Sequence, residues 1–166
     1  MMKRGYIFFI ITALVVVILD QVSKIVVAGS IKYYESIPVI DGFLSLVHIR
    51  NRGMAFGLMN RQDAQFSFYF LVAATIIAII LLIFWFNTLK GGSRRLIFGL
   101  SLILGGAIGN LIDRLRLKEV IDFIDFFIGK YHWPAFNLAD SAITVGAVWI
   151  VINIVFFSSS VGQETE

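Results

Sequence analysis

Four ionisable residues in this 166-residue sequence have a spacing that could support chemistry. Asp20 and Lys24 are four positions apart, so a helix would place them on one face. Asp122 and Asp140 differ, because no basic residue follows either of them within four positions. When two unpaired carboxyl groups lie close together, repulsion between their charges disfavours ionisation of both. One of them therefore holds a proton near neutral pH. Such a pair predicts aspartic protease chemistry, in which one carboxylate activates water and the other polarises the scissile carbonyl.

Further polar residues lie three and four positions apart, at the end of one apolar run and the start of another. These residues are Asn110, Asp113 and Arg114, followed by Asn137, Asp140 and Ser141. A charge buried in a bilayer is costly, so each ionisable group among them is a functional candidate. Ion pairing is the simpler interpretation of Asp113 with Arg114, as it is of Asp20 with Lys24.

Other catalytic chemistries fit the residue pattern less well. Lys24 has no serine three or four positions away, and Ser141 could approach it only through tertiary packing. The two histidines, His48 and His132, lie outside any H-E-x-x-H helix, which disfavours a zinc peptidase. Asp125, three residues after Asp122, is interpreted as a solvated loop acid. We therefore expect neither a metal nor a cofactor.

The elements that must position these residues are membrane-spanning helices. The chain is 58% hydrophobic and 15% charged, with a mean hydropathy of +0.87, which is too apolar for one water-soluble core. A helix needs roughly 20 residues to cross a bilayer. We expect one integral membrane domain over residues 1–166, mainly α, as a four-helix bundle. The predicted helices cover about residues 5–28, 66–87, 95–115 and 137–157.

The basic residues indicate the orientation of these helices. Lys3 and Arg4 precede the first helix, and Lys90, Arg94 and Arg95 fill the connection between the second and third. The positive-inside rule places both segments, and hence both termini, in the cytoplasm. The acidic residues then gather toward the outer leaflet. The net charge of +3 forms no continuous basic stripe, so no nucleic-acid partner is expected.

The segment after the first helix, about residues 33–60, is β-rich. Apolar stretches at 36–40 and 43–49 flank Asp41-Gly42, a dipeptide favoured in hairpin turns. Residues 114–134 form a second outer segment, which mixes charges with aromatic residues suited to a membrane interface. A small sheet at the outer membrane surface is therefore predicted.

Small residues in the third helix predict close helix packing. Gly105, Gly106 and Gly109 form a small-xxx-small pattern, which lets helix backbones approach in lipid. The first apolar run resembles a cleavable secretory signal, but the charges of Asp20 and Lys24 favour a retained helix.

At these residues the sequence resembles the lipoprotein signal peptidases, also called signal peptidase II. The resemblance covers most of the chain and rests on five motifs in order. They are Asp20-Gln-Val-Ser-Lys24, Arg50-Asn51-x-Gly53-x-Ala55-Phe56, the stretch from Gly105 to Asn110-Leu-Ile-Asp113-Arg114, Val120-Ile-Asp122-Phe, and Phe136-Asn137-Leu-Ala-Asp140-Ser141. Met54 departs from the pattern, since a small alanine is expected there.

The resemblance implies that Asp122 and Asp140 are the catalytic dyad, which cuts N-terminal to a diacylglyceryl-modified cysteine in bacterial prolipoproteins. It also implies a small extracytoplasmic β-cradle, a short surface helix and a location in the cytoplasmic (inner) membrane. Membrane lipids and these substrates are the expected partners, with no obligate protein partner. Residues implied to bind substrate or support the site are Asn51, Gly53, Asp20, Lys24, Asn110, Asp113, Arg114, Asn137 and Ser141.

Two functions of other classes stay open on the residues alone. Acidic residues in helices also mark proton- or ion-coupled transporters, although the second helix and the cytoplasmic halves of the others carry no polar relay. A non-enzymatic subunit could instead assemble through the glycine face of the third helix. Such a subunit would tolerate Asp122→Asn and Asp140→Asn, which preserve size but not acid–base function.

Overall fold

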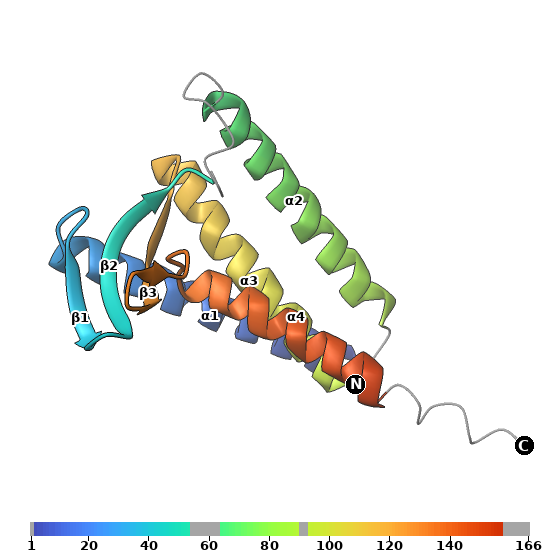
Figure 1. Cartoon of the computed structure of the whole chain (residues 1–166). Coiled ribbons are helices and arrows are strands. Elements are labelled where there is room, and N and C mark those ends of the chain that lie inside the picture. The colour runs from blue at the N-terminus through green and yellow to red at the C-terminus, as the bar shows by residue number, and fades with distance from the viewer. Residues whose placement is uncertain (1, 54–63, 90–92, 158–166) are drawn as a thin grey trace, which may run out of the picture.

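The computed structural model describes residues 2–53, 64–89 and 93–157, and its main elements are four long helices (Figure 1). The helices are α1 (Met2–Ser30), α2 (Ala64–Thr88), α3 (Arg94–Leu117) and α4 (Leu138–Phe157). All four are long and apolar enough to cross a membrane. Most of the exposed large hydrophobic side chains lie on α1, α2 and α4, as expected for surfaces that face lipid.

Helix α3 is the centre of the bundle and packs against each of the other three helices. Glycines make this contact close. A side chain on Gly105 would overlap the α1 backbone at Ala13, and one on Gly106 would overlap the α4 backbone at Ala139. The predicted role of this glycine face in packing is therefore confirmed.

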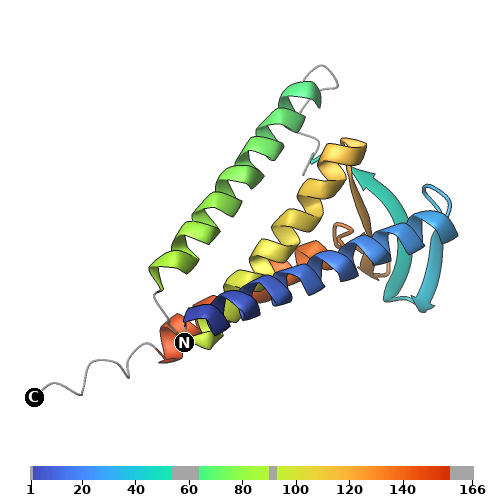
Figure 2. The ribbon, with the colours of Figure 1, turned by 180° about the vertical axis from the view of Figure 1, so that it is seen from behind.

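The C-terminal end of helix α2 packs against the start of α1. There the ring of Phe86 stacks on that of Phe9 with centroids 4.0 Å apart, and the Tyr6 hydroxyl donates a hydrogen bond to Asn87 at 2.6 Å. Along its length α2 lies beside α3 in both views (Figures 1 and 2).

A four-stranded antiparallel sheet covers one end of the bundle, called the sheet end below (Figure 1). Its strands, in spatial and chain order, are β1 (Ser36–Ile40), β2 (Leu44–Asn51), β3 (Val120–Ile128) and β4 (Tyr131–His132). The β1–β2 hairpin turns at Asp41-Gly42, where Gly42 has a φ of 76°. Strand β3 pairs with β2, so that Ile49 lies opposite Asp122 and Asn51 opposite Val120.

The structure confirms a mainly α membrane fold with a small sheet, and it extends that sheet beyond the predicted segment. The second outer segment does not stand apart from the β-rich segment, because residues 120–132 supply two strands of the same sheet. The short surface helix is not found among residues 2–53, 64–89 and 93–157, where α1–α4 are the α-helices. Met54 and the end of the predicted β-rich segment, residues 54–60, lie outside the described residues.

Candidate active site

A buried ionic cluster lies where α1 and α3 meet near the sheet end. The Lys24 ammonium is 2.9 Å from a carboxylate oxygen of Asp20 and 2.9 Å from one of Asp113, and it donates to the Asn110 amide oxygen at 3.0 Å. All four residues are at most 5% exposed. The pairing of Asp20 with Lys24 is as expected. The pairing of Asp113 with Arg114 is wrong, because the cation that contacts Asp113 is Lys24.

Gln21 joins this cluster, although sequence reasoning did not select it. Its side-chain amide nitrogen is 3.0 Å from an Asp113 carboxylate oxygen, 3.1 Å from one of Asp20 and 3.2 Å from the Gly109 carbonyl. Gln21 thus links α1 to α3 beside the ion pairs. The available sequence signal was its position between Asp20 and Lys24.

The cluster also fixes the segments that carry the two candidate catalytic acids. Asp20 accepts a hydrogen bond from the Ala139 N–H at 2.9 Å, in the first turn of α4. Asp113 accepts one from the Ile121 N–H at 3.2 Å, at the start of β3. Each contact is made one residue away from Asp140 or Asp122, so the cluster positions both.

Asp140 lies in the first turn of α4 and forms a reciprocal cap with Asn137. The Asp140 N–H donates to the Asn137 side-chain oxygen at 2.9 Å, while the Asn137 N–H donates to the Asp140 carboxylate at 3.3 Å. The other Asp140 oxygen accepts a hydrogen bond from the Asn110 amide at 2.8 Å. This acid is therefore oriented by amides and backbone groups.

Asp122 lies on β3 and is 3% exposed. One of its oxygens accepts from the Asn137 amide at 2.7 Å and the other from the Asn51 amide at 3.0 Å. Burial, assisted by the charge of Asp140, raises the pKa of Asp122 to about 6, although the amides of Asn51 and Asn137 favour the ionised form. Asn137 therefore contacts both carboxylates, through its side-chain amide at Asp122 and through its backbone N–H at Asp140.

Arg114 and Gly53 lie at the edge of this site. The Arg114 guanidinium is partly buried, within electrostatic range of Asp140 and Asp122, and its closest polar contact is the Asn110 carbonyl at 3.5 Å. The Gly53 N–H donates to the Asn51 side-chain oxygen at 2.7 Å, which orients the Asn51 amide nitrogen toward Asp122. Gly53 has a φ of 84°, in the left-handed region that favours glycine.

The remaining candidates do not join the acids. The Ser141 hydroxyl donates to the Asn137 carbonyl at 2.8 Å, a local helix contact that forms no pair with Lys24. Asp125 is not a solvated loop acid, since it is 9% exposed and lies 2.9 Å from His132. In the described part of the chain, no three His, Asp or Glu side chains are grouped so that they could hold a metal ion.

Comparisons with known proteins agree on one family. The family model for signal peptidase (SPase) II matches residues 12–156. A lipoprotein signal peptidase from Syntrophus aciditrophicus is 44% identical over 154 residues, which cover 93% of this chain and 96% of that one. A lipoprotein signal peptidase from Geobacter sulfurreducens is 40% identical over 154 residues, 93% of this chain and 95% of that one. A solved bacterial membrane enzyme superposes with a TM-score of 0.78 at 37% identity, covering 95% of this chain and 93% of that one.

Proposed function

Because this chain belongs to the lipoprotein signal peptidase (signal peptidase II) family, we propose that it cleaves prolipoproteins through an aspartic dyad formed by Asp122 and Asp140. The substrate is a diacylglyceryl-modified prolipoprotein, cut N-terminal to the lipidated cysteine. The enzyme needs no cofactor for this reaction.

The observation that supports the dyad is the division of the four acids into two pairs. Asp20 and Asp113 both form ion pairs with Lys24 at 2.9 Å, whereas Asp122 and Asp140 are held by amides of Asn51, Asn110 and Asn137. Amide donors orient a carboxylate without fixing its charge. The pKa of Asp122, raised to about 6, lets this pair retain a proton closer to neutral pH than a solvated carboxyl would.

The reaction follows from one proton shared between two carboxyl groups. The ionised carboxylate takes a proton from a water molecule, whose oxygen attacks the scissile carbonyl, while the protonated carboxyl donates its proton to the carbonyl oxygen. The tetrahedral intermediate then collapses. The C–N bond breaks as the cysteine nitrogen receives a proton from the dyad, and the signal peptide leaves with a new carboxylate.

The surrounding residues would position the substrate. Asn51 and Arg114 lie at the edge of the dyad, where they can contact an extended peptide. Strands β2 and β3 offer a surface suited to an unfolded segment. The basic residues Arg94 and Arg95, at the start of α3, lie at the opposite end from the sheet (Figure 1). By the positive-inside rule, the dyad then faces the outer leaflet of the bacterial inner membrane, with both termini in the cytoplasm.

The test is cleavage of a diacylglyceryl-modified lipobox peptide by the purified protein in detergent. Asp122→Asn and Asp140→Asn should each lower kcat by about 10²–10⁴-fold, since each removes one acid–base group at nearly constant size. Ser141→Ala is the matched control and should stay active, because its hydroxyl bonds only the Asn137 carbonyl among the described residues.

Each variant is also compared with wild type by thermal midpoint and by binding of the uncleaved peptide. Full turnover in either aspartate variant would refute the dyad. Loss of turnover in Ser141→Ala would indicate a serine nucleophile instead.

A further inference from the structure

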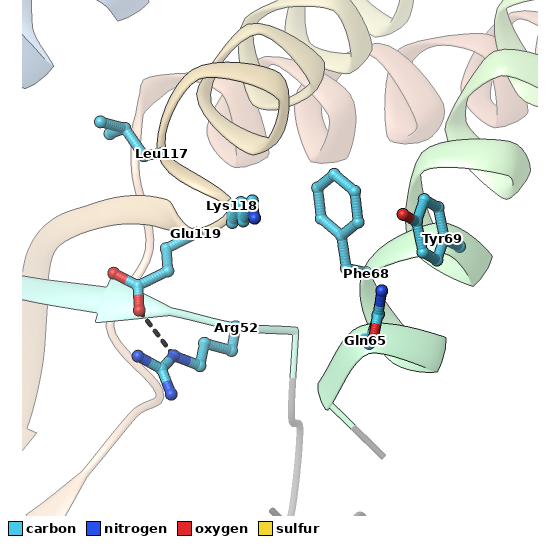
Figure 3. A pocket seen from close by; sticks show the side chains of 7 residues that line it. All are labelled: Arg52, Gln65, Phe68, Tyr69, Leu117, Lys118 and Glu119. Carbon is cyan, nitrogen blue, oxygen red and sulfur yellow. Dashed lines mark hydrogen bonds and ion pairs between the residues drawn. The ribbon is translucent and has the colours of Figure 1, made fainter. Parts of the chain in front are cut away.

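A cavity of about 490 Å³ lies at the sheet end between α2 and the end of α3 (Figure 3). Helix α2 contributes Gln65, Phe68 and Tyr69 to one wall. Lys118 and Glu119, which connect α3 to β3, form the opposite wall, and Arg52 follows the end of β2. No residue of the dyad lines this cavity.

The polar lining of the cavity consists mostly of hydrogen-bond donors. Its one acid, Glu119, is neutralised by Arg52 at 2.6 Å and Arg50 at 3.8 Å. In residues 2–53, 64–89 and 93–157, the side chains of Lys118 and Gln65 and the Tyr69 hydroxyl have no hydrogen-bond partner. Oxygen acceptors on a ligand could therefore satisfy the Lys118 ammonium, the Gln65 amide nitrogen and the Tyr69 hydroxyl.

The depth of the cavity matches the boundary between hydrocarbon and polar headgroups. The candidate membrane span in α2 begins at Gln65, and its first residues line the cavity. The span in α3 ends at Leu117, and the residues just after it line the other side. Phe68 adds an apolar surface beside the donors. The ester groups of a glycerolipid lie at this boundary, with acceptor oxygens above and hydrocarbon chains below.

The distance from the cavity to the dyad fits the covalent structure of a lipidated cysteine. Glu119, which lies just before β3, precedes Asp122 by three residues, and this corresponds to roughly 10 Å of extended chain. Eight bonds separate a scissile carbonyl carbon from an ester carbonyl carbon on the glycerol attached to the next cysteine, and this path also spans roughly 10 Å when extended. Arg52 is likewise adjacent to Asn51, whose amide contacts Asp122.

We infer that this cavity binds glycerol-ester oxygens, presented by the diacylglyceryl group of the substrate cysteine. The inference rests on the proposed function. A phospholipid of the bilayer carries the same ester chemistry, so the test has to separate the two sources.

The experiment compares two lipobox peptides that differ only in the linkage of the two chains to the glycerol, ester in one and ether in the other. Purified full-length wild type should cleave the ester peptide with a kcat/KM about tenfold higher, mainly through KM, because the ether lacks the carbonyl acceptors. Lys118→Met and Gln65→Leu should each reduce this preference, and together they should abolish it. Lys130→Met, which removes a lysine from the β3–β4 turn, is the matched control and should keep it.

Several outcomes would overturn the inference. One is an equal kcat/KM for both peptides in wild type. Another is an ester preference that persists in the Lys118→Met, Gln65→Leu double variant while its thermal midpoint is unchanged. If added phosphatidylglycerol raised cleavage of both peptides equally and Lys118→Met removed that activation, the cavity would belong to a bilayer lipid. If wild type cleaved neither peptide, the proposed function itself would fail, and this inference with it.

Discussion

The hydrogen bond from Asn51 to Asp122 should determine the pH above which cleavage stops. Burial raises the pKa of Asp122 to about 6, and the Asn51 amide, 3.0 Å away, opposes this rise because it stabilises the ionised form. Asn51→Ala removes that donor, so the pKa should rise further. A hydrogen bond to a charged group contributes about 1.5–3 kcal/mol, and one pKa unit corresponds to about 1.4 kcal/mol. The Asn51 side chain is exposed, which favours the lower value, an increase of about one pH unit.

The direction of the pH shift distinguishes loss of this hydrogen bond from general damage to the site. The dyad needs one bound proton, so kcat/KM falls as the pH rises through the higher pKa of the pair. In Asn51→Ala the midpoint of this alkaline limb should move upward from about 6, even if the maximal rate falls.

The assay is the pH dependence of kcat/KM on the diacylated peptide, from acidic to mildly alkaline conditions. Asp125→Asn is the control, because this acid lies on the same strand but contacts His132, so its midpoint should equal that of wild type. A midpoint in Asn51→Ala that stays at the wild-type pH, or moves down, would refute the reasoning.

Two further predictions concern stability. Lys24→Met leaves Asp20 and Asp113 buried without their cation and should lower the free energy of unfolding by about 3–5 kcal/mol. The thermal midpoint in detergent reports this loss, and adding Asp113→Asn should recover part of it; no recovery would contradict the ion-pair argument. Gly106→Ala should cost about 1–3 kcal/mol, because the new methyl group would overlap the α4 backbone. Gly29→Ala, which meets open space, should not lower the thermal midpoint, and equal midpoints for the two variants would argue against close packing at Gly106.

The long apolar runs made the four helices predictable, because only a helix satisfies its backbone within a single span. The strand at residues 120–128 was harder to predict. Its sequence, Val-Ile-Asp-Phe-Ile-Asp-Phe-Phe-Ile, lacks the alternation of a half-exposed strand and places its acids three apart, as a helix would. It becomes a strand because β2 offers a pairing edge, which is a tertiary effect.

The partners of the charged residues were also predictable only where both lie on the same helix. Spacing along one helix correctly paired Asp20 with Lys24, since both lie on the same face of α1. It failed for Asp113, whose neighbour Arg114 points about 100° away around the helix axis. Lys24 reaches Asp113 from another helix, 89 positions earlier in the sequence, a contact that spacing within α3 could not reveal.

The anchoring of the Asp140 segment to α1 has a consequence for biosynthesis. Asp20 is synthesised early in translation. The Ala139 N–H, which donates a hydrogen bond to it, belongs to α4, the last helix of the chain. A nascent chain that lacks α4 therefore has three helices and an ionic cluster, yet neither Asp140 nor the Asn137 amide that joins it to Asp122. If Asp122 and Asp140 form the proposed dyad, a chain without α4 should not cleave the diacylated peptide.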